Sequence, residues 1–163
     1  MFEISKVTAL AVVLACAASP AAQAAEWARL WTQWLGRDRV LDITNGGPYD
    51  NFAVIRPAGN YSGQNWKVTR DGDFHRLTTE FRGAGMCLDV VNGGANNDFV
   101  VLNPCGNYSG QLWSLRNDNG WYRLTTQFRG GAMCLDIVNG GPQNGHAHLV
   151  PCGDYSGQLW QIN

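Results

Sequence analysis

The 163-residue sequence has little net charge and lacks the motifs that mark many enzymes and nucleic-acid-binding proteins. Its 12 Lys and Arg residues nearly balance 13 Asp and Glu residues. No basic run or patch appears, which argues against a nucleic-acid partner. The sequence has no P-loop, no dinucleotide-binding fingerprint and no arrangement of nucleophile and base. We therefore expect a protein that is not an enzyme and needs no cofactor.

Candidate metal ligands are also sparse. Of the three histidines, His75 stands alone, while His146 and His148 share one face of an expected strand. That pair could form a weak metal site, but two solvated strand positions are the simpler interpretation. The cysteines lack the Cys-x-x-Cys-like spacing of a four-cysteine zinc site. The sequence predicts no metal site.

Residues 1–24 contain a short apolar run of the kind found in export signals. Residues 7–18 are apolar, Pro20 interrupts the chain, and residues 22–24 read Ala-Gln-Ala, as before a signal-peptidase cleavage site. The run is shorter than the roughly 20 apolar residues of a transmembrane helix, and no second run follows. We expect residues 1–24 to be a signal peptide, with no transmembrane span and a secreted or periplasmic protein.

A bacterial lipoprotein signal is the alternative interpretation of this segment. Residues 13–16 read Val-Leu-Ala-Cys, which resembles a lipoprotein box, and the protein would then be lipid-anchored through Cys16. Because Leu14 is an indifferent residue in such a box, cleavage after Ala24 is favoured.

The remaining domain, residues 25–163, is organised by a threefold internal repeat. Residues 103–113 read N-P-C-G-N-Y-S-G-Q-L-W, and close copies occupy residues 56–66 and 150–160. The final tryptophans of the copies, Trp66, Trp113 and Trp160, are separated by the same 47 residues. Self-similarity at a fixed period indicates a repeat architecture, with repeats of about 26–72, 73–119 and 120–163.

Each repeat shows four short strand signals separated by turn residues. In the third repeat we expect strands at residues 122–126, 134–138, 146–152 and 158–162, with Gly, Asn and Pro in the connectors. Asp71-Gly72 and Asn119-Gly120 are hairpin signals between repeats. Twelve strands in three equal units predict a closed threefold arrangement, whose last strand pairs with a first strand near residues 27–32.

Four cysteines follow the same repeat. Cys87 and Cys105 lie 18 residues apart in the second repeat, and Cys134 and Cys152 occupy the same places in the third. Four cysteines allow three connectivities, and the repeat symmetry favours the two pairs within repeats. The first repeat has an apolar residue at both equivalent positions, as expected if each pair is one physical unit. This cysteine usage agrees with an exported protein.

Two motifs in register give each repeat its resemblance to a known family. The first is Leu-Asp near the middle of the repeat, preceded by Cys in the second and third repeats, and the second is Gln-x-Trp at its end. The motifs are Leu41-Asp42, Leu88-Asp89 and Leu135-Asp136, with Gln64-Asn65-Trp66, Gln111-Leu112-Trp113 and Gln158-Leu159-Trp160. Residues 25–163 thus resemble a ricin-type β-trefoil lectin domain. The resemblance implies an all-β fold, a β-trefoil with pseudo-threefold symmetry, and glycans or a polysaccharide as partner.

The resemblance also implies where sugar binds. In the family, the matching aspartate accepts hydrogen bonds from two neighbouring sugar hydroxyls, which suits an acceptor-only carboxylate. The candidate residues are these aspartates and the asparagines three positions further on, namely Asp42, Asp89, Asp136, Asn45, Asn92 and Asn139. A competing interpretation is that Asp-x-x-Asn-Gly-Gly is a turn whose side chains bond nearby backbone. The Gln and Trp of Gln-x-Trp are expected in the core, with Gln satisfying backbone groups of the preceding turn.

One departure from the family pattern concerns the aromatic platform. Family members commonly carry an aromatic residue two positions before the second cysteine, and the apolar face of the sugar packs on it. Here those positions hold Arg56, Asn103 and Val150. A tyrosine recurs in the neighbouring loop instead, where it could provide the platform or pack the loop against the barrel. These candidate tyrosines are Tyr61, Tyr108 and Tyr155.

Two functions from different classes follow. The first is a secreted carbohydrate-binding protein with up to three shallow sugar sites and no catalytic activity, in which several weak sites raise avidity. The alternative is a cell-surface-binding or delivery subunit of a multi-protein assembly such as a bacterial toxin. Trp27, Trp31 and Trp34 of the first repeat would suit such a protein partner if they are exposed rather than closing the core.

Cleavage after Ala24 predicts a mature N-terminus that reads Ala-Glu-Trp. N-terminal sequencing or intact-mass analysis of the exported protein measures this directly. An acylated protein that begins at Cys16 would contradict the signal-peptidase interpretation and make the protein membrane-anchored.

Overall fold

The computed structural model describes residues 27–163. The expected signal peptide at residues 1–24 and the alternative lipid-anchoring residue Cys16 lie outside the described residues. In this part of the chain, no helix is long and apolar enough to cross a membrane.

The described residues form twelve short β-strands, four in each repeat, with a 3₁₀ turn before every fourth strand. The first repeat contains β1 (Leu30–Thr32), β2 (Arg39–Ile43), β3 (Ala53–Pro57), η1 (Ser62–Gln64) and β4 (Trp66–Asp71). The second contains β5 (Phe74–Thr79), β6 (Met86–Val90), β7 (Val100–Pro104), η2 (Ser109–Gln111) and β8 (Trp113–Asp118). The third contains β9 (Trp121–Thr126), β10 (Met133–Ile137), β11 (Ala147–Pro151), η3 (Ser156–Gln158) and β12 (Trp160–Ile162). The last strand is shorter than expected because Gln158 belongs to the 3₁₀ turn.

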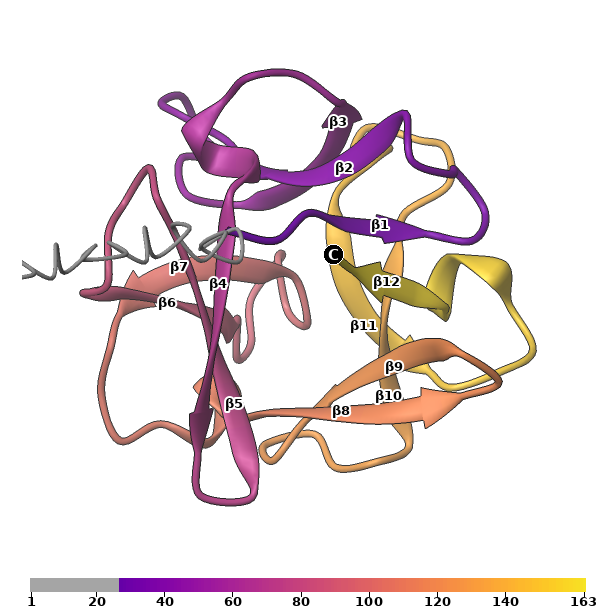
Figure 1. Ribbon diagram of the computed structural model, residues 1–163. Coiled ribbons are helices and arrows are strands. Elements are labelled where there is room, and N and C mark those ends of the chain that lie inside the picture. Colours follow the sequence, from indigo (N-terminus) through magenta and orange to yellow (C-terminus); the bar gives the residue numbers. More distant parts are fainter. Residues whose placement is uncertain (1–26) are drawn as a thin grey trace, which may run out of the picture.

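Six strands form a closed barrel. Their hydrogen-bonded order is β1-β12-β9-β8-β5-β4. The barrel closes through Ala28 and Trp66, whose backbone groups bond each other at 2.7 and 2.9 Å. β1 lies beside β12 near the C-terminus (Figure 1), with Leu30 opposite Ile162. This pairing confirms that the last strand returns to the first.

The other six strands form three hairpins that pack together. The pairs are β2–β3, β6–β7 and β10–β11, and they are arranged around the centre of the molecule (Figure 1). Isolated bridges join each hairpin to the next, namely Phe52 to Val101, Phe99 to His148 and His146 to Val54. A six-stranded barrel with three such hairpins, repeated three times along the chain, is a β-trefoil, as the sequence predicts.

The Gln-x-Trp tryptophans form the centre of the core. All three are fully buried: Trp66, Trp113 and Trp160. Each indole nitrogen donates a hydrogen bond of 2.8–2.9 Å to the carbonyl oxygen of the leucine in the Leu-Asp motif of the same repeat. A buried Trp removes roughly 150–250 Å² from water and needs a partner for its N–H. One residue per repeat therefore supplies both core volume and a link between two strands.

The two expected disulfides are present. Cys87 bonds Cys105, and Cys134 bonds Cys152, with Cα–Cα distances of 5.0 and 4.9 Å. A bridge that closes a loop of this length stabilises the fold by roughly 3 kcal/mol in the chain-entropy model. In the first repeat, the buried Val40 takes the place of the first cysteine.

The two hairpins between repeats turn at Gly residues. Asn119 and Gly120 both have positive φ, 52° and 86°, as a two-residue turn of the mirror-image type requires. In the other hairpin Asp71 pairs with Phe74, so the turn residues are Gly72 and Asp73, one position later than the dipeptide signal.

His148 makes stability depend on pH. Burial lowers its pKa below the ordinary value of 6.5, and attraction to Asp136 and Asp98 only partly offsets this. The unfolded chain then binds a proton at a higher pH than the folded chain, so the free energy of unfolding falls as the pH drops below about 6.5. The equivalent residues in the other repeats are Val54 and Val101.

We predict that His148→Val reduces the loss of stability between neutral pH and about pH 5. Urea denaturation of the wild type and the variant at both pH values measures the difference. An equal loss in the two proteins would contradict this role of His148.

Candidate functional site

Each repeat carries a shallow hollow lined by equivalent residues. Site 1 has a volume of about 360 Å³ and is lined in part by Asp42, Asn45 and Tyr61. Site 2, of about 340 Å³, is lined in part by Asp89, Asn92 and Tyr108. Site 3, of about 330 Å³, is lined in part by Asp136, Asn139 and Tyr155. The structure therefore brings the nine candidate residues together as one Asp, one Asn and one Tyr per site.

An aromatic ring from the following repeat completes each hollow. Site 1 is lined by Phe81, site 2 by Phe128, and site 3 by Trp34 of the first repeat. The backbone N–H of each ring residue donates to a serine carbonyl in the adjacent 3₁₀ turn at 3.2 Å. Sequence reasoning did not assign this role to these residues, although their 47-residue spacing is the signal that could have found them.

The tryptophans of the first repeat do not form one exposed patch. Trp27 and Trp31 are half-buried. Trp31 packs edge-on against Trp121 and donates a hydrogen bond to Asn163 at 3.1 Å. Trp34 is 40% exposed and belongs to site 3.

The site aspartates are fixed by two hydrogen bonds that recur in every repeat. One carboxylate oxygen accepts the backbone N–H of the next residue at 2.7–2.8 Å. The other accepts the side-chain amide of the Gln-x-Trp glutamine at 3.0–3.1 Å. These pairs are Gln64 with Asp42, Gln111 with Asp89, and Gln158 with Asp136. The core motif thus sets the position of the site carboxylate directly.

The glutamines also satisfy the preceding turn, as the sequence predicts. The amide of Gln64 donates to the carbonyl of Pro57 at 3.0 Å, and its oxygen accepts the N–H of Gly59 at 2.9 Å. The same bonds recur at Gln111 and Gln158. All three glutamines are fully buried. A buried amide with each of its ends bonded has one defined orientation.

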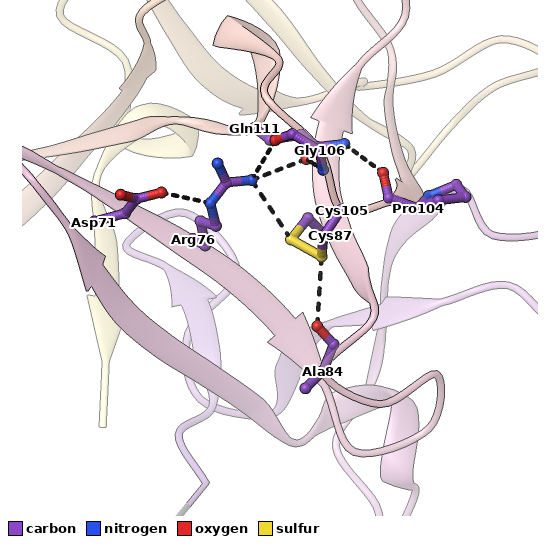
Figure 2. A network of polar contacts seen from close by, with 8 residues as sticks. All are labelled: Asp71, Arg76, Ala84, Cys87, Pro104, Cys105, Gly106 and Gln111. Atoms are coloured by element: carbon purple, nitrogen blue, oxygen red, sulfur yellow. Dashed lines mark hydrogen bonds and ion pairs between the residues drawn. A yellow bond between two sulfur atoms is a disulfide. The ribbon is translucent and has the colours of Figure 1, made fainter.

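A buried or half-buried arginine fixes that orientation. The Nη1 of Arg76 donates to Gln111 Oε1 at 3.0 Å and to the carbonyl of Gly106 at 2.9 Å. Figure 2 shows Arg76 between these groups and the carboxylate of Asp71, which it meets at 2.6 Å. Arg29 and Arg123 bond Gln64 and Gln158 in the same way. Because the guanidinium is only a donor, the glutamine oxygen faces it and the glutamine NH₂ faces the aspartate.

The aspartates are less exposed than a solvent-facing strand position suggests. Asp42 is only 6% exposed, and Asp89 and Asp136 are half-buried. A glycine in the 3₁₀ turn lies so close to each carboxylate that an added Cβ would collide with Oδ1. The carboxylates therefore have a structural role as well as any role in binding.

Acceptor capacity remains at each carboxylate. A carboxylate can accept about four hydrogen bonds, one at each lone pair. Asp42 and Asp136 each accept two. Asp89 makes a third, from the side-chain amide of Asn103 at 3.2 Å. Site 2 thus has less free acceptor capacity than the other two.

The candidate asparagines and tyrosines remain available to a ligand. The competing interpretation was that the Asp and Asn side chains of Asp-x-x-Asn-Gly-Gly bond nearby backbone groups. The aspartates do accept the next backbone N–H, but in the described part of the chain the asparagines make no such bond. Within residues 27–163, Asn45, Asn92 and Asn139 have no side-chain hydrogen bond, and exposed polar groups of this kind can bond a ligand. Each asparagine is followed by a glycine whose backbone N–H donates to the side chain four residues after that glycine. These pairs are Gly46 with Asp50, Gly93 with Asn97, and Gly140 with Asn144.

The three tyrosines present exposed rings at the edges of the hollows. Tyr61, Tyr108 and Tyr155 are each 62% exposed. Each ring lies against the glycine two positions earlier, where a Cβ would collide with it. This contact holds the ring in place, while most of its surface faces solvent.

Residues 27–163 contain no group of three or more His, Cys, Asp or Glu residues that could hold a metal ion.

Comparisons with known proteins agree with this architecture. A family model described as the ricin-type beta-trefoil lectin domain matches residues 31–126 and 76–163. No curated protein matches the sequence. The designed threefold-symmetric protein ThreeFoil is similar in structure, with a TM-score of 0.69 and 19% identity over 84% of this chain and 97% of its own.

Two natural proteins show the same similarity over part of their length. A mosquitocidal holotoxin has a TM-score of 0.71 and 15% identity over 83% of this chain, and the match covers 17% of the holotoxin. A Polyporus squamosus lectin has a TM-score of 0.66 and 13% identity over 84% of this chain and 48% of its own. At these identities the similarity shows the fold alone.

We predict that Asp42→Ala lowers the free energy of unfolding by about 1–3 kcal/mol, because buried N–H donors lose their acceptor. Asn45→Ala, in the same hollow but without a side-chain hydrogen bond, is the matched control and should leave stability nearly unchanged. Chemical denaturation of both variants measures the difference. Equal stability of the two would contradict the structural role of the carboxylate.

Proposed function

The chain belongs to the ricin-type beta-trefoil lectin domain family, and on that premise we propose that it is a secreted carbohydrate-binding protein. Its three hollows are the proposed sugar sites, one in each repeat. Residues 25–163 then act as one binding domain with glycans as its partners.

The observation that carries this proposal is the recurrence of one set of groups in all three hollows. Each has a fixed carboxylate acceptor, an asparagine amide without a protein partner, and exposed or half-buried aromatic rings. Sugar hydroxyls donate to the carboxylate and exchange hydrogen bonds with the amide. The apolar C–H face of a sugar packs on an aromatic ring. These groups suit a shallow saccharide site better than an enclosed small-molecule pocket.

The role of these groups is binding, and no catalytic step is assigned to them. The site aspartate is held by a backbone N–H and by a buried glutamine amide, in keeping with a fixed acceptor. A single shallow site binds weakly, but three sites that engage one glycan-bearing surface raise avidity through effective concentration.

Export of the protein is supported by its disulfides. Bridges such as Cys87–Cys105 and Cys134–Cys152 persist in oxidising compartments. We propose that the protein is secreted or periplasmic after removal of residues 1–24, with lipid anchoring through Cys16 as the alternative.

A cell-surface-binding or delivery subunit of a toxin-like assembly is the second candidate. Trp34, which is more exposed than Trp27 and Trp31, lines site 3 and does not form a separate patch with them. This placement favours a subunit that would use the same glycan sites over one that docks on a protein through tryptophans.

We predict that Asn45→Ala, Asn92→Ala and Asn139→Ala combined weaken glycan binding without lowering the melting temperature. Each asparagine contributes about 0.5–1.5 kcal/mol to binding at its site if it makes one net hydrogen bond to the sugar. A glycan array followed by titration calorimetry on the best ligand measures the loss. Asn117→Ala, an exposed residue outside the hollows, is the control. Unchanged affinity of the triple variant would overturn the assignment of these sites.

A further inference from the structure

The three sites differ in charge at two equivalent positions. Two residues before the second cysteine position, the repeats carry Arg56, Asn103 and Val150. In the 3₁₀-turn loop they carry Asn60, Asn107 and Asp154, which line sites 1, 2 and 3 respectively. Site 1 therefore contains one carboxylate and one guanidinium. Site 2 contains one carboxylate, and site 3 contains two and no cation among its lining residues.

Arg56 lies beside Asp42 on the surface of the β2–β3 hairpin. Arg56 is opposite Val40, and Asp42 is opposite Val54. Alternation along the strands puts these four residues on one face, so Arg56 and Asp42 are diagonal neighbours. Arg56 lines site 1 and also an adjoining hollow of about 320 Å³, which shares Asp42 and Tyr61 with it.

The guanidinium of Arg56 has no partner among the described residues. The side chain is exposed and makes no hydrogen bond or ion pair within residues 27–163. The arginines near the aromatic rings of sites 1 and 2 are different. Arg82 stacks on Phe81 and pairs with Asp50, and Arg129 is placed in the same way on Phe128 and Asp98. Of these three cations, Arg56 alone is free to meet a ligand.

The nearby carboxylate is buried more deeply than this cation. Asp42 is 6% exposed, and its two oxygens already accept the N–H of Ile43 and the amide of Gln64. The charge that faces solvent in site 1 is therefore the guanidinium. A guanidinium pairs bidentately with carboxylates and with other planar or tetrahedral oxyanions.

We propose, on the premise of the function proposed above, that site 1 binds an anionic saccharide, one that carries a carboxylate or a sulfate ester. Arg56 binds the anionic group, while Asn45 and the remaining lone pairs of Asp42 bind hydroxyls of the same sugar. Site 3 disfavours such a ligand, because Asp136 and Asp154 repel its charge. The three repeats thus differ in ligand class as well as in affinity.

The test compares affinities for matched oligosaccharides that differ only in the anionic group. One pair contrasts a terminal uronic acid with the neutral hexose, and the other contrasts a sulfated with an unsulfated sugar. The protein carries Asp89→Ala and Asp136→Ala, so that site 1 dominates. Two substitutions are made at Arg56: Arg56→Asn introduces the residue of the second repeat, and Arg56→Lys keeps the positive charge. In a separate protein that retains Asp89, Asn103→Arg introduces the cation at site 2.

We expect the acidic sugar to bind about 1.5- to 5-fold more tightly than its neutral match at low salt, the range of an exposed ion pair. Arg56→Asn should bring this ratio close to one, Arg56→Lys should retain part of it, and Asn103→Arg should raise it at site 2. About 1 M salt should reduce it. The better of the two pairs identifies the anionic group as carboxylate or sulfate.

The outcomes separate this inference from the proposed function. Sugar binding with a ratio that Arg56→Asn does not change would overturn the inference and leave the proposed function standing. No binding of any sugar by the wild-type protein would overturn both. Melting curves of the variants check the fold, and the exposed Arg56 makes no hydrogen bond or ion pair within residues 27–163 whose loss should unfold the chain.

Discussion

The hydrogen bond from the Gln-x-Trp glutamine to the aspartate of the Leu-Asp motif connects the fold to the proposed sites. In the first repeat, Gln64 donates to Asp42 at 3.0 Å, while Trp66 of the same motif donates to the carbonyl of Leu41 at 2.8 Å. The Gln and Trp side chains of the Gln-x-Trp motif thus bond the two neighbouring residues of the Leu-Asp motif. Because the tryptophans form the core, the packing that makes the barrel stable also fixes the carboxylates at its surface.

Closure of the ring has a similar consequence for the sites. Each hollow takes its carboxylate and its tyrosine from one repeat and its second aromatic ring from the next, so an isolated repeat would contain an incomplete site. Site 3 needs Trp34 from the start of the chain, and pairing of β1 with β12 brings it there. Threefold symmetry of the backbone coexists with unequal side chains, because the exposed Arg56 and the half-buried Val150 are less restricted by packing than residues of the core.

Most of the fold and much of each site could be predicted from the sequence because the repeat has a constant length. Equivalent positions predicted the disulfides and the recurring Asp, Asn and Tyr residues. The role of Phe81 in site 1 was missed because this residue belongs to the second repeat and lies in a connector between two expected strands. The burial of Asp42 was missed because it depends on two non-local contacts, the close approach of Gly63 and the amide of Gln64, 22 residues away.

The central claim is that saccharide binds at three hollows between neighbouring repeats. An NMR titration of the ¹⁵N-labelled protein with the best glycan ligand tests it most directly, since backbone amides report the position of the ligand. We expect the perturbed amides to cluster at Asp42, Asp89 and Asp136 and at the 3₁₀ turns η1, η2 and η3. Perturbations confined to another surface, such as the groove beside Cys87–Cys105 that is lined by Lys67 and Thr69, would contradict it.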